Sequence, residues 1–465
     1  MILDAHTICA PATSVGSGAI SVIRISGPQT LPILDRMVSF RHGDAATAAG
    51  YSLKFGTVPD VDDVLVSIYR APHSYTGEDA AELSCHASSY IVETLLERLC
   101  NAGCRLAEPG EFTQRAFVNG KMDLAQAEAV ADIIASVSSA QHRVAMNQLR
   151  GGYSAELRGL RSQLLELTAL LELELDFSEE DVEFADRSRL RTLLDTACSH
   201  CRQLAESFRA GNAIRNGVPV AVVGAPNSGK STLLNAILRD DRAIVSDIPG
   251  TTRDTVEETC IIDGVLFRFI DTAGIRSASD EVEQLGIERT FRKIGEAEIV
   301  LAVVDASAPE TEIRESIRMI AGKVDAKSQN LVILMNKVDL LGGNKNVNGF
   351  NNFVLNSDIS KYKTKLLEIS AKAGLGLDEL RSTLVSCSGL ASATGTLVTN
   401  ARHAAALRTA ATSLSAVSDG LDRGLPTDLL AEDLRAALEA LGSITGQITT
   451  DETLGEIFSH FCIGK

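Results

Sequence analysis

Tryptophan is absent from this 465-residue chain, and aromatic residues together make up only 4% of it. A surface built mainly to stack nucleic-acid bases on aromatic rings is therefore not expected. No apolar run reaches the ~18 residues that a membrane-spanning helix needs, and the N-terminus lacks the basic and apolar segments of a signal peptide. These absences favour a cytoplasmic protein with no membrane partner.

Positive charge is also scarce, because 44 Lys and Arg stand against 61 Asp and Glu and the net charge is −17. Proteins that hold nucleic acid mainly by neutralising its phosphates are usually basic. If RNA is a partner of this chain, we expect a local patch to bind it.

The pattern of apolar and polar residues changes along the chain, and these changes predict several domains. Short β-like runs such as AISVIRISG and DVLVSIYR predict a small α+β domain over residues 1–120. Helical periodicity predicts the first part of a helical domain over 121–216 and its second part over 389–465. Between them, residues 217–388 alternate apolar strand-like runs with helical stretches, which is typical of a parallel sheet covered by helices. We therefore expect an α/β domain inserted into a helical domain.

Leucines spaced three and four residues apart mark an apolar face in each helical part. They are Leu157, Leu160, Leu164, Leu167 and Leu171 in the first part and Leu430, Leu434, Leu438 and Leu441 in the second. For the first set, a core-facing helix is the simpler interpretation, and the seam of a dimer or bundle is the alternative.

The stretch GAPNSGKS, from Gly224 to Ser231, fits the phosphate-loop pattern G-x-x-x-x-G-K-[ST]. It follows a strand-like run and precedes a helix-like one, so its backbone N–H groups can surround phosphate oxygens at a helix N-terminus. Lys230 is expected to reach the β- and γ-phosphates, and the Ser231 hydroxyl to bind Mg²⁺. This stretch predicts a site for a nucleoside triphosphate.

Three later motifs, each after a strand-like run, together predict a GTP-binding domain. DTAG (271–274) offers a carboxylate toward Mg²⁺ and a glycine N–H toward the γ-phosphate, and SAK (370–372) supports the base. The carboxylate of NKVD (336–339) accepts hydrogen bonds from guanine N1–H and the 2-amino group, donors that adenine lacks in that arrangement. The residues expected to bind GTP are Asn227, Ser228, Gly229, Lys230, Ser231, Thr232, Ser246, Asp247, Ile248, Pro249, Gly250, Thr251, Thr252, Asp271, Thr272, Ala273, Gly274, Asn336, Lys337, Asp339, Ser370, Ala371 and Lys372.

The group that helps water attack GTP is less evident from the sequence. Small regulatory GTPases use a Gln after the DTAG-type glycine, but Ile275 occupies that place here. Asn227 is a candidate ligand for a monovalent cation whose charge would replace an arginine finger. Thr252, in AIVSDIPGTTRD, is the candidate second Mg²⁺ ligand. The carboxylates of DEVE (280–283) are either functional or ordinary solvated charges.

Taken together, GAPNSGKST, AIVSDIPGTTRD, DTAGIRSASDEVEQLGIERT, NKVD and the terminal FCIGK resemble the MnmE (TrmE) family of tRNA-modification GTPases. The resemblance covers nearly the whole chain, and PGEFTQRAFVNGKMDLAQAEA and FCIGK are its most particular stretches. It implies a Ras-like P-loop GTPase domain inserted into a helical domain, together with an N-terminal α+β domain that binds tetrahydrofolate and dimerises.

The same resemblance implies a K⁺-dependent GTP hydrolase that works with the FAD-dependent partner MnmG. The pair would add a carboxymethylaminomethyl or aminomethyl group at C5 of the wobble uridine of certain tRNAs. A 5-formyl- or 5,10-methylene-tetrahydrofolate would be bound, and a one-carbon unit would come from it. A homodimer, a heterotetramer with MnmG and GTP hydrolysis coupled to dimerisation of the GTPase domains are further implications.

Carried over by position, the resemblance also implies ligand sets. Asn227, Ser246, Ile248 and Thr251 would hold K⁺, whereas Ser231 and Thr252 would hold Mg²⁺. Glu283 would be the catalytic acid that orients water. Folate contacts would be Arg24, Glu82, Lys121 and Lys465. The cations among them suit an anionic glutamyl tail, and a carboxylate suits the N–H donors of a pterin. The stretch SVGSGA (14–19) lacks the basic residue that family members commonly carry there.

Nine cysteines without a dense regular framework are typical of reduced thiols. Cys462 does not belong to a prenylation signal, because CIGK departs from the C-a-a-X pattern. The resemblance puts this tail at the folate site, so we prefer a catalytic or substrate-positioning role for Cys462 over a structural one. The pair Cys198 and Cys201 is expected to pack in a helical core, and so is the pair at 100 and 104.

Two other classes of GTPase compete with this interpretation. A GTPase that assists ribosome assembly would confine its chemistry to GTP, but the acidic balance, the FCIGK tail and the lack of a basic C-terminal RNA-binding module count against it. A membrane-shaping dynamin-like GTPase would need an apolar paddle or a basic tip, and the sequence has neither.

Overall fold

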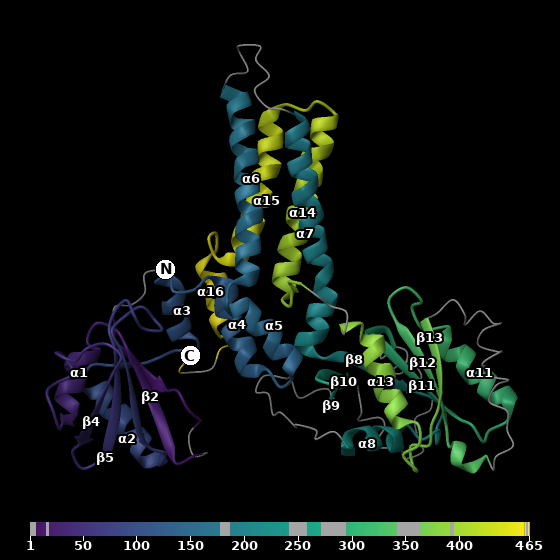
Figure 1. The fold of residues 1–465 in the computed structure, drawn as a ribbon, viewed down its shortest axis with the longest axis horizontal. Coiled ribbons are helices and arrows are strands. Elements are labelled where there is room, and N and C mark those ends of the chain that lie inside the picture. Colours follow the sequence, from purple (N-terminus) through teal and green to yellow (C-terminus); the bar gives the residue numbers. More distant parts are fainter. Residues whose placement is uncertain are drawn as a thin grey trace. The chain divides into compact units, whose positions relative to one another are not determined.

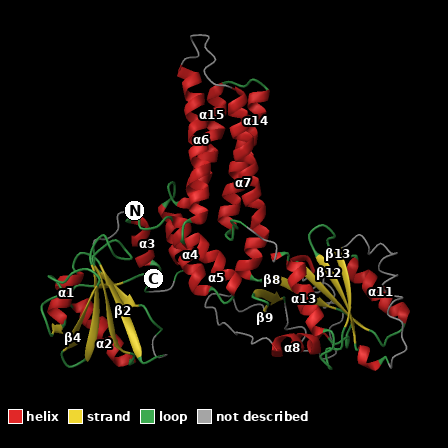
Figure 2. Cartoon of the chain, viewed as in Figure 1, coloured by secondary structure: helices red, strands yellow, loops and turns green. Residues whose placement is uncertain are grey.

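The computed structural model describes residues 6–14, 18–176, 187–240, 258–270, 294–341, 363–390, 395–459, 461 and 464. The chain separates into two compact units, each of which is described by itself below (Figures 1 and 2). The first unit holds Met1–Ile134, Met146–Cys198 and Thr409–Lys465, and the second holds Ala135–Ala145 and Ser199–Arg408. Each unit therefore combines segments that are far apart in the sequence.

The first unit begins with a seven-stranded sheet in the order β3-β4-β5-β6-β2-β1-β7. Neighbouring strands are antiparallel, except that β1 and β7 pair in parallel. The strands are β1 (Ile8–Pro11), β2 (Ile20–Ser26), β3 (Ser39–Phe40), β4 (Ser52–Val58), β5 (Asp62–Tyr69), β6 (Ala80–His86) and β7 (Arg105–Leu106). Helices α1 (Thr30–Met37) and α2 (Ser89–Asn101) complete this α+β part.

Alternation of apolar and polar residues gives this sheet one buried face. In β5, Val64 and Val66 are buried whereas Leu65 is 42% exposed, because successive side chains of a strand point to opposite faces. The buried face shares one hydrophobic core with α1 and α2. Arg24 of β2 and Glu82 of β6 are direct partners across the sheet and lie on the opposite face. The strands predicted from AISVIRISG and DVLVSIYR are confirmed.

Helices make up the rest of the first unit, with α6 and α15 side by side (Figure 1). They include α3 (Glu111–Val118), α4 (Leu124–Ala135), α6 (Gly152–Asp176), α15 (Thr427–Thr445) and α16 (Asp451–Ser459). The predicted apolar faces are confirmed as core, since the buried leucines include Leu157, Leu160, Leu164, Leu167, Leu430, Leu434, Leu438 and Leu441. The side chain at 171 lies outside the described part. No helix within the described ranges has the length and apolar character that crossing a membrane requires.

Helices α5 (Ser139–Leu149), α7 (Arg187–Asn216) and α14 (Ala401–Asp422) contain residues of both units, as does α4 through its last residue, Ala135. The Cys198 thiol of α7 is buried and donates to the Ala411 carbonyl oxygen of α14 at 3.5 Å. Cys201 is fully buried as well. These contacts confirm that CSHC packs in a helical core, and among the residues that the structure describes no cluster of three or more His, Cys, Asp and Glu side chains is arranged to hold a metal ion.

The second unit is built on a six-stranded sheet in the order β13-β12-β11-β8-β10-β9. All neighbouring strands are parallel except β9 and β10. The strands are β8 (Val218–Val223), β9 (Glu258–Ile262), β10 (Val265–Phe269), β11 (Ile299–Asp305), β12 (Asn330–Asn336) and β13 (Lys363–Glu368). The parallel sheet predicted from the apolar runs between residues 217 and 388 is therefore confirmed.

Helices cover both faces of this second sheet. They are α8 (Lys230–Asp240), α11 (Glu310–Ala321) and α13 (Leu377–Ser388), with the short 3₁₀ helix η1 (Val338–Leu340) after β12. Leu233 of α8 and Leu380 of α13 share one core with Val220 and Val222 of β8. Ile317 of α11 shares the other core with residues of β8, β11 and β12 that point the opposite way. This two-sided α/β arrangement lies between α7 and α14 in the sequence, as expected for a GTPase domain inserted into a helical domain.

A buried ionic network joins α3 to the N-terminal sheet. Arg115 of α3 is fully buried and donates to both carboxylate oxygens of Glu78 at 3.1 and 3.2 Å. It also donates to the Glu111 carboxylate and to the His6 carbonyl oxygen, both at 2.9 Å. Removal of the guanidinium would leave two carboxylates without their shared partner in a water-poor environment.

We expect Arg115→Ala to lower the free energy of unfolding of the N-terminal part by about 3–5 kcal/mol, the usual cost of breaking a buried ion pair. Amide hydrogen exchange in β2 and β6 measures this effect locally. Arg158→Ala is the matched control, because Arg158 is 57% exposed, lies 3.6 Å from Asp123 and should contribute less than about 1 kcal/mol. Equal effects of the two substitutions would contradict a stabilising role for the buried network.

Candidate functional site

The phosphate loop connects β8 to α8 and contains two positions that exclude any side chain. A Cβ at Gly224 would collide with the carbonyl oxygen of Val303 in β11. Gly229 has a φ of +98°, and a Cβ there would collide with the Asn336 amide. Glycine is required at both places, so the loop packs tightly against the end of the sheet.

Lys230, the first residue of α8, turns its ammonium group back over the loop. Its Nζ donates to the carbonyl oxygens of Gly224 at 2.9 Å and Ala225 at 2.7 Å. The N-terminus of α8 adds partial positive charge from its backbone N–H groups. The loop thus combines a cation and a helix N-terminus at one place, as a phosphate group requires.

Asn227 and Ser231 offer oxygen ligands on either side of that lysine in the sequence. Asn227 is exposed and adopts a left-handed φ of +59°, which Asn tolerates better than most residues. Ser231 and Thr232 lie in the first turn of α8. Amide and hydroxyl oxygens are hard donors of the kind that alkali and alkaline-earth cations prefer. The residues present therefore fit the expected K⁺ and Mg²⁺ ions chemically.

Asn336, at the end of β12, ties the phosphate loop to the SAK segment. It is only 2% exposed, and its Nδ2 donates to the Ser228 carbonyl oxygen at 2.8 Å. Its Oδ1 accepts from the Ala371 N–H at 3.0 Å. Ser370 is fully buried, and its Oγ accepts from the Ala373 N–H at 3.1 Å. One amide therefore aligns the loop for the phosphates with the loop expected to support the base.

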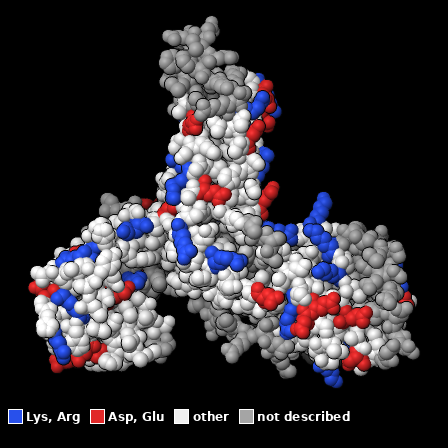
Figure 3. Space-filling view, viewed as in Figure 1, with Lys and Arg blue, Asp and Glu red and all other residues white. Residues whose placement is uncertain are grey.

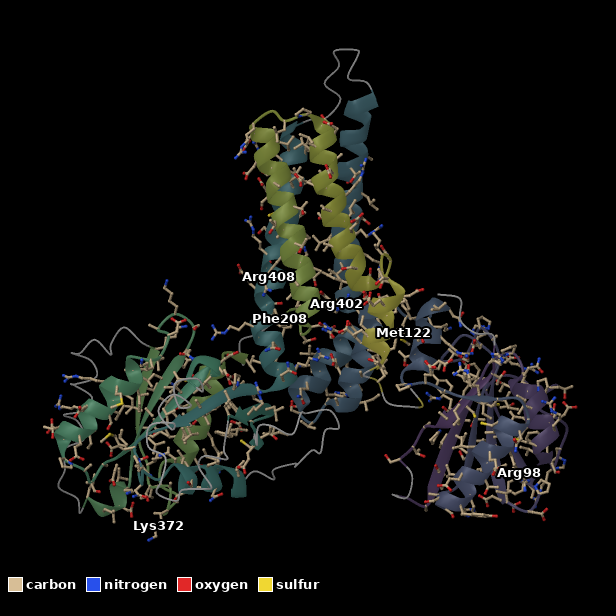
Figure 4. The ribbon with its side chains drawn as sticks, turned by 180° about the vertical axis from the view of Figure 1, so that it is seen from behind. Arg98, Met122, Phe208, Lys372, Arg402 and Arg408 are labelled. Carbon is tan, nitrogen blue, oxygen red and sulfur yellow. The ribbon has the colours of Figure 1, made fainter. Side chains whose placement is uncertain are left out.

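Lys337 is held by an ion pair with Asp305 at the end of β11, with Nζ and Oδ2 2.6 Å apart. Burial alone would raise the pKa of the Asp305 carboxyl, but hydrogen bonds from Lys337 and Ser307 outweigh it and lower that pKa below its usual value. Asp339 follows on η1 and is exposed, as is Lys372 at the surface of the unit (Figure 4). The carboxylate expected to read guanine is accessible to a ligand.

A second constellation lies on the N-terminal sheet, in the first unit. The Arg24 Nε and Nη2 donate to Glu82 Oε1 at 3.1 and 2.8 Å. Its Nη1 donates to the carbonyl oxygen of Gly464, the residue before the C-terminus, at 3.2 Å. Burial, followed by the nearby Glu82 carboxylate, raises the pKa of Tyr69 beside this pair. Two of the expected folate contacts and the tail are therefore brought together.

Lys121, the third expected folate contact, is placed apart from the ion pair. Its Nζ donates to the Pro72 carbonyl oxygen at 2.9 Å, and its stem lies against Gly77. These contacts place Lys121 against the loop that carries Tyr75, and the Tyr75 ring faces Arg24. The structure shows no direct contact between Lys121 and Arg24 among the interactions of the described residues.

The remaining expected site residues lie outside the described part of the chain. These are Ser246, Asp247, Ile248, Pro249, Gly250, Thr251, Thr252, Asp271, Thr272, Ala273, Gly274, Glu283, Cys462 and Lys465. Their assignments stay predictions.

Comparison with known proteins covers the whole chain. The model of the MnmE helical domain matches residues 124–462, and that of the GTP-binding protein TrmE N-terminus matches residues 7–121. The tRNA modification GTPase MnmE of Bacteroides thetaiotaomicron is 49% identical over 100% of each chain. The chain belongs to the MnmE family. The protein of the same name from Flavobacterium johnsoniae is 46% identical, again over 100% of each chain.

As a member of the MnmE family, the protein is a GTP hydrolase that acts in tRNA modification. Among solved structures it is similar to the G domain of the T. maritima FeoB iron transporter, with 24% identity and a TM-score of 0.27 over 37% of this chain and 98% of that one. A likeness of this size supports no functional conclusion. On the face drawn in Figure 3, both Lys and Arg and Asp and Glu side chains are exposed.

Two aromatic residues near Arg24 were not singled out by the sequence. The Arg24 guanidinium carbon lies 5.3 Å from the ring centroid of Tyr75 and 5.8 Å from that of Phe112. Both residues stand in stretches that carry the MnmE resemblance, SYTGEDAAEL and PGEFTQRAF. Because only 4% of the chain is aromatic, an aromatic residue in each of these two stretches was the signal in the sequence that could have drawn attention to Tyr75 and Phe112.

We expect Asp339→Asn to weaken GTP binding by on the order of 100-fold, because a charged acceptor for guanine N–H groups is lost. Xanthosine triphosphate should bind more tightly to the variant than to the wild type, since its C2 carbonyl accepts where guanine donates. Competition against a fluorescent nucleotide measures both affinities. Asp378→Asn, at an exposed carboxylate paired with Arg381, is the control and should change neither. GTP affinity near the wild-type value would show that Asp339 does not read the base.

Proposed function

We propose that this MnmE-family protein is a K⁺-dependent GTPase that, with the FAD-dependent protein MnmG, adds a carboxymethylaminomethyl or aminomethyl group at C5 of the wobble uridine of certain tRNAs. The observation that carries the proposal is the approach of the C-terminal tail to the Arg24–Glu82 pair, through the Gly464 carbonyl. It joins the particular FCIGK stretch to the domain proposed to bind the one-carbon donor, within a chain that also carries a GTPase domain.

The GTPase part of the proposal assigns a role to each group of the phosphate loop. Lys230 binds the β- and γ-phosphates, and Ser231 with Thr252 holds Mg²⁺, which neutralises charge on the phosphates. Asn227, with Ser246, Ile248 and Thr251, holds K⁺, which supplies the positive charge of an absent arginine finger. Glu283 orients the attacking water, since Ile275 has no hydrogen-bonding side chain. The exposed Asn227 oxygen and the helix N-terminus beside it support this assignment.

The folate part of the proposal uses the N-terminal sheet. Glu82 is a suitable acceptor for the adjacent N–H donors of a pterin, and Arg24, Lys121 and Lys465 suit an anionic glutamyl tail. The group bound there would supply a one-carbon unit at the tetrahydrofolate oxidation level. Cys462 belongs to the tail that reaches this sheet, so we assign it a catalytic or substrate-positioning role.

The partners follow from the same reaction. A tRNA is the substrate, and a flavoprotein supplies the redox chemistry that this chain's own side chains do not offer. We propose a homodimer that joins MnmG in a heterotetramer, with GTP hydrolysis coupled to dimerisation of the GTPase domains. Exposed charge of both signs on the drawn face agrees with a local rather than extended contact with RNA.

Potassium dependence has a direct test in Asn227→Gly, which removes the amide oxygen and keeps the left-handed backbone accessible. We expect the hydrolysis rate in KCl to fall by on the order of 100-fold, the typical loss of one transition-state charge contact. The rate in NaCl should stay at the low wild-type level, with GTP affinity within about threefold because the phosphate loop backbone is retained. Asn147→Gly, at an exposed asparagine elsewhere, is the control. A variant that kept the full K⁺ stimulation would refute the ligand assignment.

The modification itself is tested by mass spectrometry of tRNA nucleosides from cells lacking the gene. We expect loss of the C5-aminomethyl-type wobble uridines, recovery with the wild-type gene and no recovery with Lys230→Ala or Cys462→Ser. Full recovery with Cys462→Ser would make that thiol structural. An unchanged nucleoside profile in the deletion strain would refute the proposal and favour a GTPase that assists ribosome assembly.

A further inference from the structure

The chain turns at Lys337, between two residues of the guanine motif that differ in their surroundings. Asn336 ends β12 and is buried, and its side chain is bonded to the phosphate loop and to the Ala371 N–H. Asp339 follows two residues after Lys337, lies on η1 and is exposed. The turn therefore decides where the carboxylate expected to read guanine stands relative to the phosphate loop.

Lys337 makes this turn in an unfavourable backbone conformation. Its φ of +67° and ψ of +32° lie in the left-handed region, which residues with a long side chain rarely adopt. Asn227, at a φ of +59°, belongs to a residue type whose short polar side chain can hydrogen-bond locally and so tolerates this region. A lysine side chain has no acceptor for such a local bond, so a contact with another segment must offset the cost of the turn.

That contact is the ion pair with Asp305, whose Oδ2 lies 2.6 Å from the Lys337 Nζ. The other carboxylate oxygen, Oδ1, accepts from the backbone N–H of Ser307 at 2.9 Å and from its hydroxyl at 2.6 Å. Burial opposes ionisation, but the bonds from Lys337 and Ser307 outweigh it and lower the pKa of the Asp305 carboxyl. The carboxylate is therefore both charged and fixed in orientation when it meets Lys337.

Backbone hydrogen bonds hold the chain on both sides of the turn. Asp305 and Asn336 are direct partners in the parallel pairing of β11 and β12, and the Ala306 N–H donates to the Asn336 carbonyl oxygen at 2.8 Å. After the turn, the Val338 N–H donates to the Ile369 carbonyl oxygen at 3.3 Å. Neighbouring segments thus hold the residues that flank Lys337, and Asp305 holds the side chain between them.

We infer that Asp305 is a positioning residue for guanine recognition, because its ion pair with Lys337 stabilises the left-handed turn that presents Asp339 to the base. The side chains of Lys337 and Asp305 are 31% and 26% exposed, and ion pairs this accessible to water add little to overall stability. The effect of Asp305 is therefore expected in nucleotide selection and not in folding. The inference rests on the expected contact between Asp339 and guanine and is independent of the proposed tRNA chemistry.

Affinities of the full-length chain for GTP and for inosine triphosphate test this role. Asp305→Asn keeps the shape of the side chain and an acceptor for Ser307, but it loses the charge that holds Lys337. We expect the affinity for GTP to fall on the order of tenfold and that for inosine triphosphate roughly threefold, because inosine lacks the 2-amino donor that a correctly placed Asp339 binds. The hydrolysis rate at saturating GTP and amide hydrogen exchange in β11 and β12 should stay at their wild-type values.

Substitutions of Lys337 separate the turn from a direct contact of its side chain with the nucleotide. Glycine adopts the left-handed region without strain, so the double variant Asp305→Asn, Lys337→Gly should bind GTP as tightly as Lys337→Gly alone. Lys337→Ala, which lacks both the ammonium group and that backbone freedom, should bind GTP more weakly than Lys337→Gly. Equal affinities of the alanine and glycine variants would overturn the inference.

Glu310→Gln is the matched control, because it removes the exposed ion pair with Arg314 on α11 and should change neither affinity. Wild-type discrimination between GTP and inosine triphosphate in Asp305→Asn, beside a clear loss in Asp339→Asn, would reject the positioning role and leave the guanine contact standing. Wild-type discrimination in both variants would reject the guanine contact of Asp339 and the inference with it. Neither result depends on the activity of the protein toward tRNA.

Discussion

The guanine-nucleotide site depends on the parallel pairing of β8, β11 and β12. Parallel strands end at the same edge of a sheet, so the loop after β8, Asp305 of β11 and Asn336 of β12 meet there. The Asn336 amide then joins the Ser228 carbonyl to the Ala371 N–H. Loss of the register would separate the groups expected to contact the phosphates from those expected to contact the base, whereas loss of one polar bond would only loosen their alignment.

The N-terminal site is assembled by a different constraint, in which a fixed surface receives a distant segment. Arg24 and Glu82 are opposite each other in antiparallel strands, and this register brings their side chains together on one face. The carbonyl that completes the site comes from 440 residues further along the chain. Apolar packing of Phe458 and Phe461 against Leu124 holds that segment close, so the polar contact alone does not have to offset the entropy of closing a long loop.

Local patterns were sufficient for most of the fold, because strands and helices are specified by periods of two and 3.6 residues and the phosphate loop by its glycines. Contacts between residues that are distant in the sequence could not be predicted from it. Nothing in the sequence pairs Lys337 with Asp305, or places Tyr75 and Phe112 beside Arg24. Arg24 shows the physical reason, because the charge of a side chain is visible in a sequence but its pairing with Glu82 and the Gly464 carbonyl is not.

The residues expected to bind GTP belong to the second unit, whereas Arg24, Glu82 and Gly464 belong to the first, and helices α5, α7 and α14 contain residues of both units. Within the second unit, Gln141 of α5 donates to the Arg215 carbonyl oxygen near the end of α7 at 2.8 Å, and its Oε1 caps the N–H groups before α5. A Cβ at Gly264, in the turn between β9 and β10, would collide with the Ser139 hydroxyl at the start of α5. The β9–β10 hairpin is thus packed against α5, a helix that continues into the first unit. Because α5 and α7 each contain residues of both units, the hairpin of the second sheet is packed against helices whose backbone the two units share.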